Sequence, residues 1–150
     1  MTNRIKHYFD TQELVCKHVY ERFGDEALKF FDHRLLETLL WIRENLGKPI
    51  YVNNWQIGGS LTQRGLRCNR CALVKEKTNL EKVYMSSHIC GKGVDFNVKD
   101  MSPKYVKDWI VAHQDELPYP IRLELNTPTW THLDVCEYAM RVDKITWVNG

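Results

Sequence analysis

Three short segments in the second half of the chain alternate between apolar and other residues, with the period of two that is typical of half-buried β-strands. Their apolar positions are Val94, Phe96 and Val98, then Ile121, Leu123 and Leu125, then Leu133 and Val135. The positions on the opposite face are Asp95 and Asn97, then Arg122 and Glu124, then Trp130, His132 and Asp134. The pattern predicts a sheet with one face on a core and one polar face that stays open.

Helix signals dominate the first third of the chain. Asp10 and Glu13 have the spacing of a capping box, which predicts a helix that ends at Gly24. Over 26–46, apolar residues recur at intervals of three and four, which predicts a longer helix with Gly47 as its stop signal.

The remaining segments complete the expected fold. A strand is expected over 49–53, a long irregular loop over 54–82, and a short edge strand over 145–148. Ser102, followed by a proline, predicts the start of a helix between the first two alternating strands. The order predicts one α+β domain over 1–150, with N-terminal helices packed on a small, mostly antiparallel sheet.

Charge and hydropathy exclude some partners. The net charge is +2 and the basic residues are scattered, which is too mild a balance for a nucleic-acid-binding protein. No apolar run approaches the ~20 residues of a membrane span, and no signal-peptide core follows the N-terminus. We therefore expect a monomer that is cytoplasmic as synthesised, with neither a nucleic acid nor a membrane as partner.

Two segments carry the residue types of a zinc site. Catalytic Zn²⁺ sites use three His, Asp or Glu ligands and leave a fourth position for water. Asp95 and His132 lie on the polar face of two expected strands, and Gly91 and Gly93 allow a tight bend that returns His88 toward Asp95. Each histidine alone is more simply a surface or core residue, but the joint pattern predicts a Zn²⁺ site on the open face of the sheet.

The same face carries a carboxylate that could serve as an acid or base. If 127–129 forms the hairpin loop, Glu124 lies opposite His132, with Cβ atoms about 5 Å apart. A loop of four residues would place Leu123 there and break the face assignment, so we expect the first register.

The segment around the first predicted ligand resembles a known signature. Ser86-x-His88-x-x-Gly91-x-Gly93-x-Asp95 is similar to the Ser-x-His-x-x-Gly-x-Ala-x-Asp motif of the zinc D-alanyl-D-alanine carboxypeptidase and L-alanoyl-D-glutamate endopeptidase family. Gly93 stands where that family has Ala, which is a small change on a strand.

Further segments extend this resemblance over roughly 27–135. Trp130-x-His132 resembles the family's second signature, and Arg64-Gly65-Leu66-Arg67 resembles its arginine-bearing segment. The hedgehog signalling domain shares the architecture. The resemblance implies zinc ligands at His88, Asp95 and His132, and hydrolysis of an amide bond in a peptidoglycan stem peptide. The bond would be D-Ala-D-Ala or L-Ala-D-Glu. The lack of a leader would suit a phage lysis protein released by other means, or a cytoplasmic dipeptidase.

The position of the catalytic acid departs from the commonest pattern of the family. Many members carry it three residues before the second histidine, where this chain has Thr129; others carry it on the preceding strand, where Glu124 would fill the role. The alternative is a zinc-binding module of the same fold without catalysis, as the hedgehog resemblance allows.

Four residues are candidates for substrate binding. Arg64 and Arg67 would pair with a substrate carboxylate through their bidentate geometry, or they are solvated loop charges. Trp130 would line one side of the substrate groove, or it only packs against neighbouring residues. Ser86 would hydrogen-bond Asp95 or substrate, or cap a turn.

The chain has five cysteines, an odd set without disulfide-framework spacing, which fits reduced thiols. Cys68 and Cys71 form a lone Cys-x-x-Cys pair. A structural zinc would need two further ligands, which Cys16 with His18, or Cys90, could supply. We expect instead two free thiols in a loop.

Overall fold

Within residues 2–136 and 143–150, which the computed structural model describes, the strands form one five-stranded sheet in the order β1-β2-β4-β3-β5. The strands are β1 (Ile50–Tyr51), β2 (Gly93–Val98), β3 (Ile121–Glu124), β4 (Thr131–Asp134) and β5 (Ile145–Val148). All neighbouring strands are antiparallel except β3 and β5, which are parallel. The predicted α+β fold with a mostly antiparallel sheet is confirmed.

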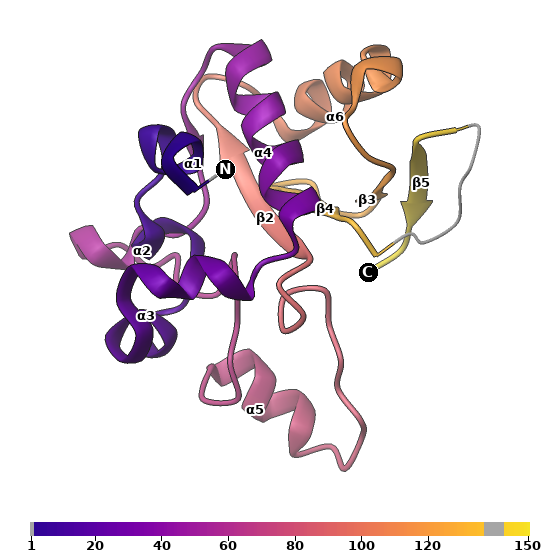
Figure 1. Ribbon diagram of the computed structural model, residues 1–150. Helices are drawn as coiled ribbons and strands as arrows, with labels where there is room; N and C mark the ends of the chain where they lie inside the picture. Colours follow the sequence, from indigo (N-terminus) through magenta and orange to yellow (C-terminus); the bar gives the residue numbers. More distant parts are fainter. Residues whose placement is uncertain (1, 137–142) are drawn as a thin grey trace.

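Helices surround this sheet on both sides (Figure 1). The α-helices are α1 (Thr2–Tyr8), α2 (Thr11–Leu14), α3 (Lys17–Phe23), α4 (His33–Leu46), α5 (Ala72–Thr78) and α6 (Pro103–Ala112). The described residues also form three 3₁₀ segments: η1 (Gly24–Phe30), η2 (Trp55–Ile57) and η3 (Gln114–Glu116). Among the described residues, no helix is both long and apolar enough to cross a bilayer.

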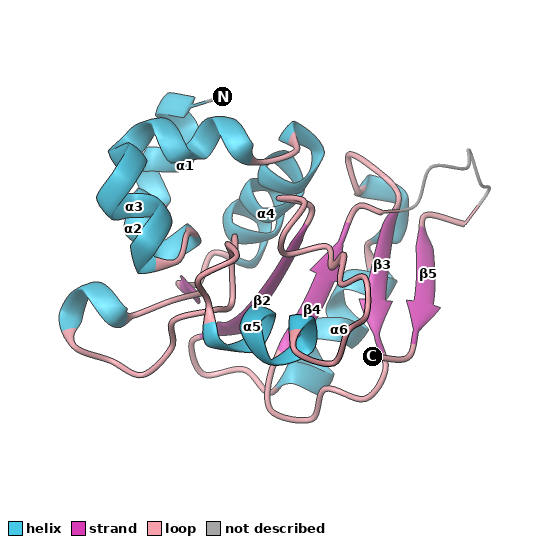
Figure 2. Ribbon diagram, turned by 90° about the horizontal axis from the view of Figure 1, so that it is seen from below, coloured by secondary structure: helices cyan, strands magenta, loops and turns pink. Residues whose placement is uncertain are grey.

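The main core lies between the sheet and two helices. The apolar strand positions, such as Phe96, Leu123 and Leu133, are fully buried against side chains of α4 and α6. Figure 2 shows α5 on the other side of the sheet from α6. The polar positions of β2 and β4 therefore face away from the core.

The first predicted helix is split in two. Asp10 and Glu13 form the expected capping box at the start of α2, and Gly24 ends α3. Between them the chain is extended, because Val15 forms a parallel bridge with Leu66. The backbone hydrogen bonds of that bridge replace those of a continuous helix.

The expectation of one helix over 26–46 was wrong in its first turns. Residues 24–30 are a 3₁₀ segment, and α4 begins only at His33. The Asp32 side chain accepts a hydrogen bond from the Arg34 amide, and the Asp32 amide donates to the carbonyl of Gly91. The cap and the hydrogen bond between Asp32 and Gly91 place the start of α4 at His33. The predicted end of the helix at Gly47 is confirmed.

The expectation of an irregular loop over 54–82 was also wrong in part, because that segment holds η2 and α5. The helix after Ser102 is confirmed, and the Ser102 side chain accepts a hydrogen bond from the Tyr105 amide. Leu123 pairs with Leu133, which is the hairpin register that a loop over 127–129 requires.

Candidate metal centre

Three side chains with metal-binding atoms converge beside the sheet, and they are the three predicted ligands. Asp95 on β2 pairs directly with His132 on β4, and His88 comes from the turn before β2. One ligand atom from each residue lies within 4.8 Å of the others. Both histidines are buried, and Asp95 is half-buried.

A tight bend brings His88 to this position. Gly91 has a φ of +66°, which favours glycine, and a side chain there would also overlap the carbonyl of Phe30. The Gly91 carbonyl accepts the Asp32 amide at 2.9 Å, so the start of α4 holds the bend in place.

The ring of His88 is oriented by a backbone group. Its Nδ1 lies 2.9 Å from the carbonyl oxygen of Gly65, which can only accept a hydrogen bond. Nδ1 therefore carries the proton, and Nε2 faces Oδ2 of Asp95 at 3.3 Å. Nε2 therefore faces the cluster, where it donates to Asp95 when the ring is protonated and offers a lone pair to a metal ion when the ring is neutral.

His132 is oriented by a carboxylate. Its Nδ1 lies 2.7 Å from Oδ1 of Asp95, and its Nε2 lies 3.0 Å from Oδ2 of Asp134. Asp134 is 1% exposed and accepts two hydrogen bonds from Arg122, at 2.7 and 3.0 Å. Imidazole ligands in metal sites typically donate their second N–H to such an acceptor.

The charges in the cluster stabilise one another. Burial opposes ionisation of Asp95, but hydrogen bonds from His132 and His88 outweigh it and hold the pKa of this carboxyl well below its usual range. Burial likewise opposes the charge on His132, yet hydrogen bonds with Asp134 and Asp95 raise its pKa to about 9. The pKa of Asp134 is lowered for the same reason, with Arg122 adding to the effect. Without a metal ion, the protonated ring of His132 supplies the positive charge between the carboxylates of Asp95 and Asp134.

The donor set fits a divalent metal ion. Two imidazole nitrogens and one carboxylate form a ligand set that Zn²⁺ accepts in catalytic sites. In each histidine the nitrogen that faces away from Asp95 has its own acceptor, Gly65 or Asp134, so the other nitrogen remains for the metal. These residues form a candidate metal-binding group.

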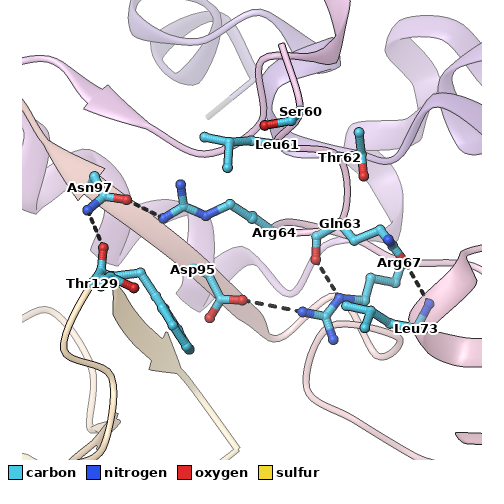
Figure 3. A pocket seen from close by; sticks show the side chains of 11 residues that line it. Ser60, Leu61, Thr62, Gln63, Arg64, Arg67, Leu73, Asp95, Asn97 and Thr129 are labelled. Carbon is cyan, nitrogen blue, oxygen red and sulfur yellow. Dashed lines mark hydrogen bonds and ion pairs between the residues drawn. The ribbon is translucent and has the colours of Figure 1, made fainter.

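A pocket of about 430 Å³ opens next to Asp95 (Figure 3). Its lining includes Arg64, Arg67, Asn97, Thr129 and Trp130. Arg67 donates to Oδ2 of Asp95 at 3.3 Å, and Arg64 donates to Oδ1 of Asn97 at 2.5 Å. Three of the four proposed substrate residues thus line one cavity next to the candidate metal ligands.

Ser86, the fourth of these residues, and Glu124, the predicted acid, lie outside this cavity. The Ser86 hydroxyl accepts a hydrogen bond from the Ile89 amide and caps the turn that carries His88; Ser86 is not among the pocket-lining residues. The register places Glu124 across from His132, but its carboxylate lies against Gly150, and it does not line the pocket. Their proposed roles remain predictions.

Two supporting groups were missed in the sequence. Arg122 shares the polar face with Asp134 and pairs with it across β3 and β4, which the hairpin register could have indicated. The carbonyl of Gly65 carries no side-chain signal, so its bond to His88 could not be anticipated.

Comparisons of the chain with family models, with curated proteins and with solved structures found no match.

Proposed function

We propose that this protein is a zinc-dependent hydrolase that cleaves an amide bond in a peptidoglycan stem peptide. The observation that carries the proposal is the convergence of His88, Asp95 and His132 beside an arginine-lined pocket. These three residues are also the ones on which the resemblance to the zinc carboxypeptidase and endopeptidase family rests.

The pocket has features that suit a peptide with a free carboxylate. Zinc bound at the three ligands would lower the pKa of a coordinated water toward ~7 and polarise a carbonyl group. Arg64 and Arg67 place two guanidinium groups in the pocket lining, where either could pair with a substrate carboxylate. Trp130 adds an aromatic wall, which suits the apolar part of a peptide.

Glu124 is our candidate for the acid and base. It would take a proton from the attacking water and return it to the leaving amine. Since its carboxylate now contacts Gly150, this role requires the side chain to turn toward His132. Full activity of the Glu124→Ala variant at unchanged zinc content would remove Glu124 from the mechanism.

A second candidate function is a zinc-binding module without turnover. It is favoured by Thr129, which lines the pocket at the position where many family members carry the acid. It is also favoured by the contact of Glu124 with Gly150, outside the pocket lining.

Mass spectrometry of a defined muropeptide incubated with the protein separates the two functions. The hydrolase predicts cleavage fragments that disappear with chelator and in His132→Ala, while the exposed-residue control His7→Ala retains activity. Bound zinc with an intact muropeptide would favour the binding module. Cleavage that survives both chelator and His132→Ala would contradict the proposal.

A further inference from the structure

A second group of metal-binding side chains lies away from the pocket described above. It consists of Cys16 and His18, at the start of α3, and Cys68 and Cys71, just before α5. The two pairs are about fifty residues apart in sequence, and the fold brings one ligand atom of each residue within 4.8 Å of all the others.

The distance between one pair of these atoms matches that of zinc ligands. With Zn–S bonds of about 2.3 Å and Zn–N bonds of about 2.0 Å, tetrahedral ligand atoms lie about 3.5–3.8 Å apart. The sulfur of Cys68 lies 3.7 Å from Nδ1 of His18. The sulfur atoms of Cys16 and Cys71 lie within 4.8 Å of these two atoms and of each other.

Two of the sulfur atoms accept hydrogen bonds from backbone amides. The amide of Arg70 points to the Cys68 sulfur, and the amide of Cys68 points to the Cys71 sulfur, each at 3.4 Å. Cys16 and Cys71 are almost completely buried within a small apolar cluster that includes Val15, Leu66 and Val74. The amides would stabilise thiolates bound to a metal ion, and the apolar packing fixes the positions of Cys16 and Cys71.

We propose that Cys16, His18, Cys68 and Cys71 bind a second, structural Zn²⁺ ion. Three thiolates and one imidazole complete four-fold coordination, which is the closed arrangement of structural zinc sites. A disulfide would use only two of the three sulfurs, and the structure has all of them as free cysteines. The coordination requires only zinc and the loss of three thiol protons to solvent.

This second site lies directly next to the segment that builds the first. Cys68 follows Arg67, which contacts Asp95, and Gly65, whose carbonyl orients His88. The amide of Cys16 also donates to the carbonyl of Leu66 in the same segment. The zinc therefore fixes the arginine-bearing segment to the N-terminal helices and, through it, positions the first metal cluster.

Metal content and cobalt spectroscopy test the proposal. The wild type is expected to bind two zinc ions per chain, and Cys68→Ser and His132→Ala one each. Cys90→Ser is the matched control, because Cys90 is an exposed cysteine outside the cluster, and it should keep both ions. With Co²⁺, a thiolate-to-metal charge-transfer band is expected in the wild type and in His132→Ala, and its loss is expected in Cys68→Ser.

Thiol alkylation of the wild type gives a second measurement that does not depend on folded variants. Cys68 is the informative thiol, because Cys16 and Cys71 are buried with or without metal. Zinc should protect Cys68 and chelator should expose it, while Cys90 reacts in both conditions. Equal labelling of Cys68 with and without zinc would overturn the proposal. So would a Cys68→Ser variant that keeps two ions and the charge-transfer band. Because the band reports sulfur ligands, this result is independent of any peptidase activity.

Discussion

At the scale of single residues, Asp134 is important because it fixes the orientation of His132. It accepts the Nε2 proton of that ring and is itself held by Arg122. We expect Asp134→Asn to weaken zinc binding at the first site by roughly 10–100-fold, as loss of such a carboxylate does in other metal sites. Competition with a metal-sensitive dye measures this, and Asp115→Asn, at an exposed position, serves as the control. An unchanged affinity in Asp134→Asn would show that the contact does not support the ligand.

The pKa of His132 predicts how the stability of the zinc-free protein depends on pH. Because this pKa is raised to about 9 in the folded state, against about 6.5 when unfolded, the protonated ring stabilises the fold below pH 6.5. This contribution, roughly 3 kcal/mol, is expected to disappear as the pH rises from 6.5 to 9. Denaturant unfolding of chelator-treated protein across this range measures it. A free energy of unfolding that stays flat in the wild type, as we expect for His132→Ala, would contradict the assignment.

The side chain of Ser87 leaves no room for a side chain at Gly93. A methyl group at Gly93 would lie 2.6 Å from Cβ of Ser87, so the serine occupies the space that an alanine side chain would need. We expect Gly93→Ala to lower the free energy of unfolding by about 1–3 kcal/mol through overpacking. The double variant Ser87→Gly/Gly93→Ala should recover most of this loss in urea unfolding. Additive losses in the double variant would show that the two positions are not coupled.

At the scale of elements, the start of α4 supports the bend that carries His88. Asp32 caps the helix and pairs with Arg34, while its amide binds the carbonyl of Gly91. Asp32→Ala keeps the amide but removes the cap, and we expect a loss of about 1 kcal/mol in the free energy of unfolding. Thermal or urea denaturation measures this, with Asp115→Ala as the control. A variant as stable as the control would mean that the cap contributes nothing to α4.

The strands and the ligands they carry could be predicted from the sequence. Alternation of apolar and polar residues placed Asp95 and His132 on one face, and the loop length gave the register that pairs Leu123 with Leu133. Both signals are local and periodic, so a single sequence suffices to find them.

The remaining features depend on contacts between distant segments. The break before α3 follows from the bridge between Val15 and Leu66, and α4 starts late because Asp32 binds Gly91. The proximity of His18 to Cys68 needs the same long-range packing. Local propensity carries no signal for such contacts, which explains why these boundaries and the second cluster could not be fixed in advance.

At the scale of the whole molecule, residues 64–71 connect the two groups of candidate metal ligands. Arg67 and Gly65 contact one of them, and Cys68 and Cys71 belong to the other. In Cys68→Ser, we expect faster amide hydrogen exchange across this segment and around Cys16, because the cross-link is lost. Cys90→Ser should exchange like the wild type. Unchanged protection in Cys68→Ser would mean that the second cluster does not hold the segment.

The central claim is that one metal ion is bound between His88, Asp95 and His132. Anomalous diffraction from crystals of the zinc-loaded protein, measured on either side of the zinc absorption edge, tests it most directly. The expected result is a peak within bonding distance of Nε2 of His88, a carboxylate oxygen of Asp95 and Nδ1 of His132, absent from crystals of His132→Ala. Zinc-loaded crystals with no peak at these three side chains would contradict the claim.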